Sequence, residues 1–88
     1  MEINQYIMKN FKNEDIRRII FIVKKKINGI VSVEELLTII QKTTYYVCKV
    51  LNNYPYNYYK NTINNVFDIV IDYLAVSSEK GVCFKTIV

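Results

Sequence analysis

Helix-breaking residues are scarce in this chain, and that scarcity most constrains what it can fold into. Its 88 residues include two glycines, Gly29 and Gly81, and one proline, Pro55. Between these points the sequence runs without a residue that stops a helix. Because 51% of the residues are apolar, such stretches can share one core. We therefore expect a single all-α domain over residues 1–88, with three to four helices and a short C-terminal tail.

Local signals predict where the first helices begin and end. Apolar spacing indicates a short helix over residues 2–11. Asn13, followed by two acidic residues, is typical of a helix start, and the apolar stripe after it continues to about Lys26. Asn28-Gly29 predicts a turn. Ser32, with glutamate three residues later, predicts the next helix through a capping box.

The last long helix is expected after Pro55, because apolar residues recur at helical spacing from there to about Val76. Residues 77–81 would end it. Residues 82–88 are short, apolar and tolerant of β-structure, so they predict either a packed tail or a single edge strand. Ile69 and Ile71 widen the apolar face of this helix, which suits deeper burial or a homodimer contact.

Missing residue types argue against enzyme chemistry. The chain has no histidine, and its two cysteines, Cys48 and Cys83, lie far apart. An imidazole base, a histidine metal ligand and a CxxC site are therefore excluded. No phosphate-binding glycine loop or nucleophile elbow occurs. We expect a non-enzyme with no cofactor and no bound metal.

Hydropathy predicts a cytoplasmic protein without a membrane span. The longest unbroken apolar run, residues 19–23, is far too short to cross a bilayer. The first four residues show no basic signal-peptide region. Charge is also unevenly distributed: no acidic residue occurs between Glu35 and Asp68, whereas three lysines do. That interval could face a polyanion without repelling it.

Residues 33–53 are a candidate helix-turn-helix. If the chain turns at Gln41-Lys42, Thr43 becomes the N-cap of a second helix that runs from Thr44 to about Asn53. Val47, Val50 and Leu51 would then point inward. The outward side chains would offer a cation, an amide and an aromatic hydroxyl to the major groove. The predicted duplex-DNA surface comprises Lys49 and Asn52 against bases, Tyr45 against a base or sugar, and Lys42, Thr43, Thr44, Tyr46 and Asn53 along the backbone.

The ending Tyr46-Val47-Cys48-Lys49-Val50-Leu51-Asn52 resembles the "TV-x-R-V-L-N" ending of helix-turn-helix proteins. The order of elements over most of the chain resembles the small sporulation regulators of the stage III D type, and residues 65–73 are similar to their final helix. This resemblance implies a sequence-specific transcriptional regulator that binds duplex DNA. Gln41 stands where that family has a turn glycine.

The same residues also fit a different structure. The apolar residues from Val33 to Leu51 form one uninterrupted helical stripe, and no breaker separates Ile40 from Thr44. In that case the chain is a helical bundle and a non-enzymatic protein-interaction module, such as an immunity-type or phage-encoded inhibitor. Phe21 and the basic side of its helix would then contact the partner. A helix break at residues 41–43 distinguishes the two hypotheses.

Overall fold

The computed structural model describes residues 13–85. The predicted helix over residues 2–11 therefore lies outside the described part. The elements, in order, are α2 (Glu14–Lys26), α3 (Val33–Tyr45), the π-helical η1 (Tyr46–Leu51), α4 (Tyr56–Ile69), the π-helical η2 (Val70–Leu74), β1 (Ala75–Ser78) and β2 (Gly81–Phe84).

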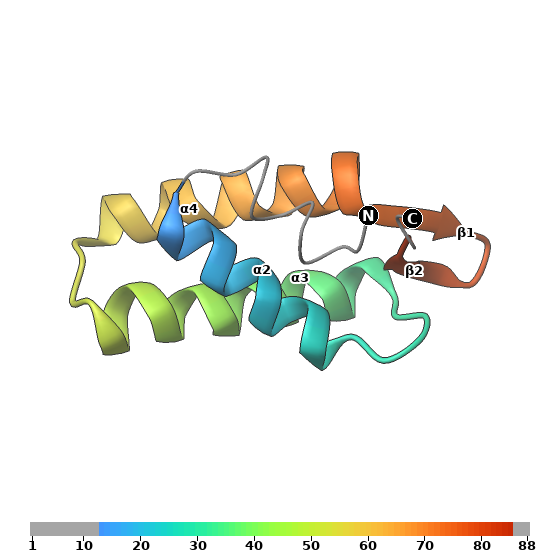
Figure 1. Cartoon of the computed structure of the whole chain (residues 1–88), viewed down its shortest axis with the longest axis horizontal. Coiled ribbons are helices and arrows are strands. Elements are labelled where there is room, and N and C mark those ends of the chain that lie inside the picture. The colour runs from blue at the N-terminus through green and yellow to red at the C-terminus, as the bar shows by residue number, and fades with distance from the viewer. Residues whose placement is uncertain (1–12, 86–88) are drawn as a thin grey trace.

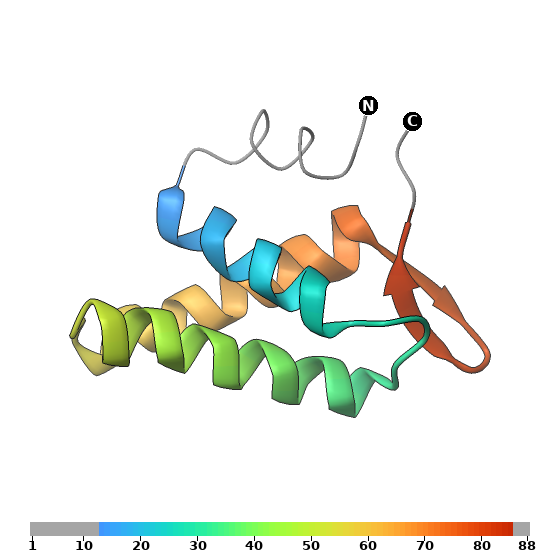
Figure 2. The same cartoon turned by 60° about the horizontal axis from the view of Figure 1, so that its bottom comes forward.

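Helices α3 and α4 run in opposite directions and are joined at one end by residues 52–55 (Figures 1 and 2). Each continues directly into a π-helical segment, so each forms one long rod. Helix α2 packs across both rods. The β-hairpin projects from the end of η2, at the opposite end of the molecule from the α3–α4 connection. The β-hairpin thus lies at one end of the fold, and the connection between the two rods lies at the other.

The predicted helix starts at Asn13 and Ser32 and the predicted turn at Asn28-Gly29 are confirmed. The side chain of Asn13 accepts a hydrogen bond from the Ile16 amide at 3.1 Å and caps α2. Ser32 Oγ accepts from the Glu35 amide at 3.1 Å and caps α3. Gly29 adopts a φ of 87° in the connection between the two helices. These features follow from residues close in sequence.

The predicted break at residues 41–43 is wrong, because α3 passes through them without interruption. Thr43 is not an N-cap: it lies inside the helix and is buried. The amide of Tyr46 donates to the carbonyls of Lys42 and Thr43, so helical hydrogen bonding continues into η1. Among the described residues Asn53 is the one non-glycine residue with a positive φ, 52°, so the chain turns there instead.

The fold is mostly helical, as expected, but its C-terminal part is a β-hairpin and not a tail or a single edge strand. Strands β1 and β2 pair antiparallel, with Ser78 opposite Gly81. Val82 also exchanges two backbone hydrogen bonds with Val31, at 2.9 and 2.6 Å. Strand β2 is therefore hydrogen-bonded on both sides, and the α2–α3 connection is tied to the C-terminal part of the domain.

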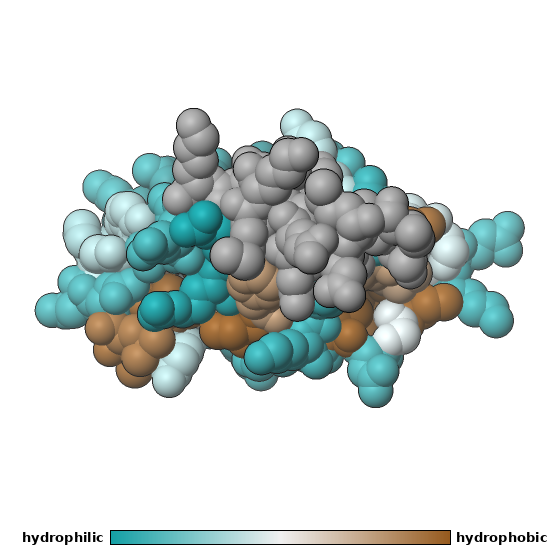
Figure 3. All heavy atoms as spheres, in the orientation of Figure 1, coloured by the Kyte–Doolittle hydropathy of each residue, from teal (hydrophilic) through white to brown (hydrophobic). Residues whose placement is uncertain are grey.

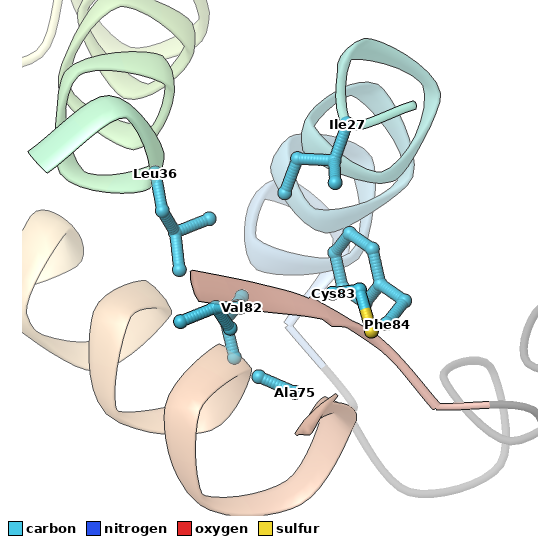
Figure 4. A pocket seen from close by; sticks show the side chains of 7 residues that line it. Ile27, Leu36, Ala75, Val82, Cys83 and Phe84 are labelled. Atoms are coloured by element: carbon cyan, nitrogen blue, oxygen red, sulfur yellow. The ribbon is translucent and has the colours of Figure 1, made fainter. Parts of the chain in front are cut away.

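One apolar core unites the helices and the hairpin. Its members come from α2, from both rods and from β2: Ile19, Ile20, Val23, Leu36, Ile40, Val47, Cys48, Val66, Val70, Leu74 and Val82. Figure 4 shows the side chains of Ile27, Leu36, Val82 and Ala75 around the gap between the hairpin and the helices. That gap is too small to admit a water molecule. The hairpin therefore covers one end of the core and encloses no ligand cavity.

Gly81 is required by close backbone contact. Its φ is 148°, and a Cβ added there would lie 2.8 Å from the carbonyl carbon of Val31. We expect Gly81→Ala to destabilise the domain by about 2 kcal/mol or more, because backbone strain and overlap act together. Gly29→Ala is the control, since no atom lies within 4 Å of its added Cβ; it should cost only about 1 kcal/mol, from its positive φ. Urea unfolding of both variants measures this, and equal losses would contradict the Val31 contact.

Candidate functional site

The structure separates the eight residues that were predicted to contact DNA. Thr43 and Thr44 are buried in the core face of α3. Lys49 Nζ donates to the backbone oxygen of Tyr54 at 2.7 Å. Asn52 Nδ2 donates to Asp15 Oδ1 at 3.2 Å. The remaining four, Lys42, Tyr45, Tyr46 and Asn53, are exposed. The predicted set does not form one surface.

The π-helical segment η1 explains much of this rearrangement. A π-helix hydrogen-bonds five residues back, where an α-helix bonds four back, so residues that follow it are rotated relative to α-helical spacing. Val47 and Cys48 are buried within η1. Val50 and Leu51, expected to point inward, are instead 60% and 48% exposed. Asn52, which follows η1, is hydrogen-bonded to Asp15 of α2.

Val50 and Leu51 belong to a wider exposed surface, which we call the apolar patch. It comprises Tyr45 (53% exposed), Tyr46 (49%), Val50, Leu51 and Tyr56 (64%). Tyr59 connects its two sides: the ring centroid of Tyr59 lies 5.8 Å from that of Tyr45 and 6.0 Å from that of Tyr56. In Figure 3, hydrophobic surface is visible at this end of the molecule. The patch therefore spans the last turns of one rod and the first turn of the next.

A half-buried carboxylate fixes the connection beside the patch. Asp15, in the first turn of α2, accepts hydrogen bonds from Asn52, from the Tyr54 hydroxyl at 3.0 Å and from the Tyr58 hydroxyl at 3.4 Å. We call these four residues the Asp15 clamp. The rings of Tyr54 and Tyr58 also pack together, with centroids 4.3 Å apart. The clamp ties α2 and α4 to the connection between the two rods.

The clamp predicts a pH dependence. The pKa of Tyr54 is raised above its ordinary 10.0, first by its hydrogen bond to Asp15 and then by the charge of that carboxylate. A raised folded-state pKa means that the fold favours the protonated phenol, so this stabilisation is complete below the unfolded pKa and is lost as pH rises through the folded one.

We therefore expect Tyr54→Phe to be less stable than wild type at about pH 7 to 9, with the difference shrinking above about pH 10. Urea unfolding across this range measures it. Tyr56→Phe serves as a control outside the clamp. A Tyr54→Phe deficit that stays constant to high pH would contradict the hydrogen bond to Asp15.

The exposed charges beside the patch on the two rods are of one sign. Lys42 lies one helical turn before Tyr46, and Lys60 one turn after Tyr56; both lysines are exposed. No acidic residue occurs between Glu35 and Asp68. At the start of α2, Asp15 is held in the clamp, and Glu14 pairs with Arg17 at 3.9 Å. The patch is thus bordered by cations.

The other candidate sites offer no metal ligands, reactive nucleophile or fully exposed contact residue within the described residues. In residues 13–85 no group of three or more histidine, cysteine or acidic side chains lies together to hold a metal. Burial raises the pKa of the Cys48 thiol above its ordinary 9.0, so this thiol is a poor nucleophile. Phe21, predicted as a partner contact, is partly buried and packs against the core. Ile69 and Ile71 pack there too.

The sequence signals for the patch and the clamp were incomplete. Four tyrosines follow Asn53 within six residues, and the structure divides them: Tyr54, Tyr58 and Tyr59 pack at the core, whereas Tyr56 is exposed. Asp15 was interpreted only as a helix-start residue. No local signal relates it to residues 52–58.

Comparison with known proteins gives no relative from which a role could be transferred: no family model, no curated protein and no solved structure matches the chain. Within the described range no helix combines the length and the apolar character needed to cross a bilayer. The arrangement of the apolar patch, its lysines and the Asp15 clamp is therefore the basis for assigning a function.

Proposed function

We propose that this domain is a non-enzymatic protein-interaction module that binds a partner protein through the apolar patch. The observation that carries the proposal is the exposure of five large apolar or aromatic side chains, each close to half exposed or more, at one end of the fold. Large contiguous patches of this kind mark interaction surfaces. Tyrosine is enriched in such interfaces because its ring buries much area with few rotatable bonds.

The patch is also held in place before any partner arrives. Its residues sit on helical turns, and the Asp15 clamp fixes the connection between the two rods. Binding then costs less conformational entropy than it would on a mobile loop. This preorganisation supports recognition of a partner by a rigid surface.

Duplex DNA is the second candidate, favoured by the absence of acidic residues between Glu35 and Asp68 and by the exposed Lys42 and Lys60. Lysines that line one surface attract phosphates. The helix-turn-helix motif would be absent, because α3 has no turn at residues 41–43. DNA would also offer no apolar surface to Val50 and Leu51. For this reason we rank it below a protein partner.

Three forms of the purified chain distinguish the candidates. The patch variant is Val50→Ser with Leu51→Ser; the control is Val33→Ser with Val76→Ser, which also removes two exposed aliphatic side chains. We expect one protein from source-cell extract to be retained by wild type and control and lost from the patch variant. Titration of a labelled AT-rich duplex runs in parallel. Equal retention by all three forms, or duplex binding alone, would contradict the proposal.

A further inference from the structure

We infer that the partner presents an acidic amphipathic helix to the apolar patch, with apolar side chains on one face and carboxylates beside them. This inference rests on the proposed function and specifies the chemistry of the partner. It combines the exposed apolar residues with the sign of the charges that border them.

The shape of the patch suits a helix. Its residues come from the end of the α3–η1 rod and the start of α4, and Tyr59 bridges the two through its ring contacts. Packed helices lie about 8–10 Å apart, which is close to the diameter of one helix with its side chains. A helix laid across the end of both rods would therefore bury apolar anchors against Val50, Leu51 and Tyr56 together.

The lysines beside the patch favour a negatively charged helix. Lys42 and Lys60 each lie one turn from a patch tyrosine, on antiparallel rods, so both cations lie on the side of the patch that faces away from the 52–55 connection (Figure 1). Lys49 adds a third positive charge, although its ammonium group also donates to the Tyr54 carbonyl. A helix with carboxylates along the side that faces away from the connection would meet both lysines. A basic helix would meet like charges and no free carboxylate from residues 36–67.

The exposed aliphatic side chains of the patch favour this ligand over a nucleic acid. Phosphate contacts require donors and cations, which the lysines supply, but Val50 and Leu51 are exposed at the end of the first rod. Phosphates there would lose water without gaining a hydrogen bond. A helix with one apolar face and flanking carboxylates can contact both the exposed aliphatic side chains and the lysines.

Three labelled synthetic peptides of about 20 residues, roughly 30 Å as a helix, test the inference by fluorescence anisotropy with the full chain. The first has a leucine face and a glutamate face; the second replaces the glutamates with lysines; the third replaces the leucines with serines. We expect the acidic leucine peptide to bind at least about tenfold more tightly than either of the others, a difference of about 1.4 kcal/mol. Added salt should weaken its binding.

Two double variants locate the binding. Val50→Ser with Leu51→Ser, and separately Lys42→Glu with Lys60→Glu, should each weaken the acidic peptide about tenfold or more. The second pair should also improve binding of the lysine peptide. Val33→Ser with Val76→Ser should change nothing. All six positions are exposed, and circular dichroism checks that each variant is folded.

Different outcomes would contradict the acidic helix and the proposed protein interaction. Tighter binding of the lysine peptide through Val50 and Leu51 would overturn the acidic partner and leave the protein-interaction proposal standing. The same would follow if no peptide bound at about 1 mM while extract capture still depended on the patch. Binding of an AT-rich duplex, lost on Lys42→Glu with Lys60→Glu, together with no peptide binding and no capture, would overturn both.

Discussion

Lys42→Pro should destabilise the domain by about 3 kcal/mol or more, enough to unfold much of a small protein. Residue 42 lies in the interior of α3, and proline there removes a helical hydrogen bond and clashes with the preceding turn. A helix-turn-helix with its turn at residues 41–42 would tolerate proline far better, because turns accept it. This substitution therefore tests the continuity of α3 through residues 41–43.

Two controls isolate the backbone effect. Lys42→Gln removes the charge and keeps the helix, so its stability should stay within about 0.5 kcal/mol of wild type. Val33→Pro places proline at the first position of the same helix, after Ser32 in an extended conformation, where proline is favoured. Thermal unfolding of the three variants measures the difference. A Lys42→Pro protein as stable as Lys42→Gln would contradict the continuous helix.

Asp15→Ala should cost about 2–3 kcal/mol, the second largest effect. The substitution removes one carboxylate that accepts from Asn52, Tyr54 and Tyr58, and hydrogen bonds to charged groups are worth more than neutral ones. The loss is moderated because the site is only partly buried and water can reach the freed donors.

Glu14→Ala is the matched control for Asp15→Ala, since it removes an acidic residue from the same helical turn. Its carboxylate is exposed and forms only a 3.9 Å pair with Arg17, so the loss should stay below about 1 kcal/mol. Urea unfolding at neutral pH compares the two. Similar losses would mean that Asp15 acts only through the helix dipole, and the clamp would be wrong.

The parts of the fold that sequence predicted are those determined by neighbouring residues. The Asn13 and Ser32 caps each involve an amide three residues away, and the turn at Gly29 requires only its own backbone freedom. Such signals lie within one short window. The mostly helical fold followed from them and from the scarcity of breakers.

The parts that sequence did not predict depend on residues far apart or on a small change in helix geometry. The hairpin depends on Val82 meeting Val31, 51 positions earlier. Val50 and Leu51 are exposed in the π-helical segment, whereas α-helical spacing assigns both to the core. Asn52 could not be matched with Asp15 by spacing, because the fold alone brings them together. For these reasons the predicted site residues were dispersed, and the apolar patch was found only in the structure.

The central claim is that the apolar patch binds a protein, and site-specific photo-cross-linking tests it most directly. A benzophenone side chain is placed at residue 50 of the full chain, or at the similarly exposed residue 33 as control, and source cells are irradiated. We predict a protein adduct from residue 50 that Leu51→Ser abolishes and that residue 33 does not form. Adducts formed equally from both positions, or from residue 50 to nucleic acid alone, would contradict the claim.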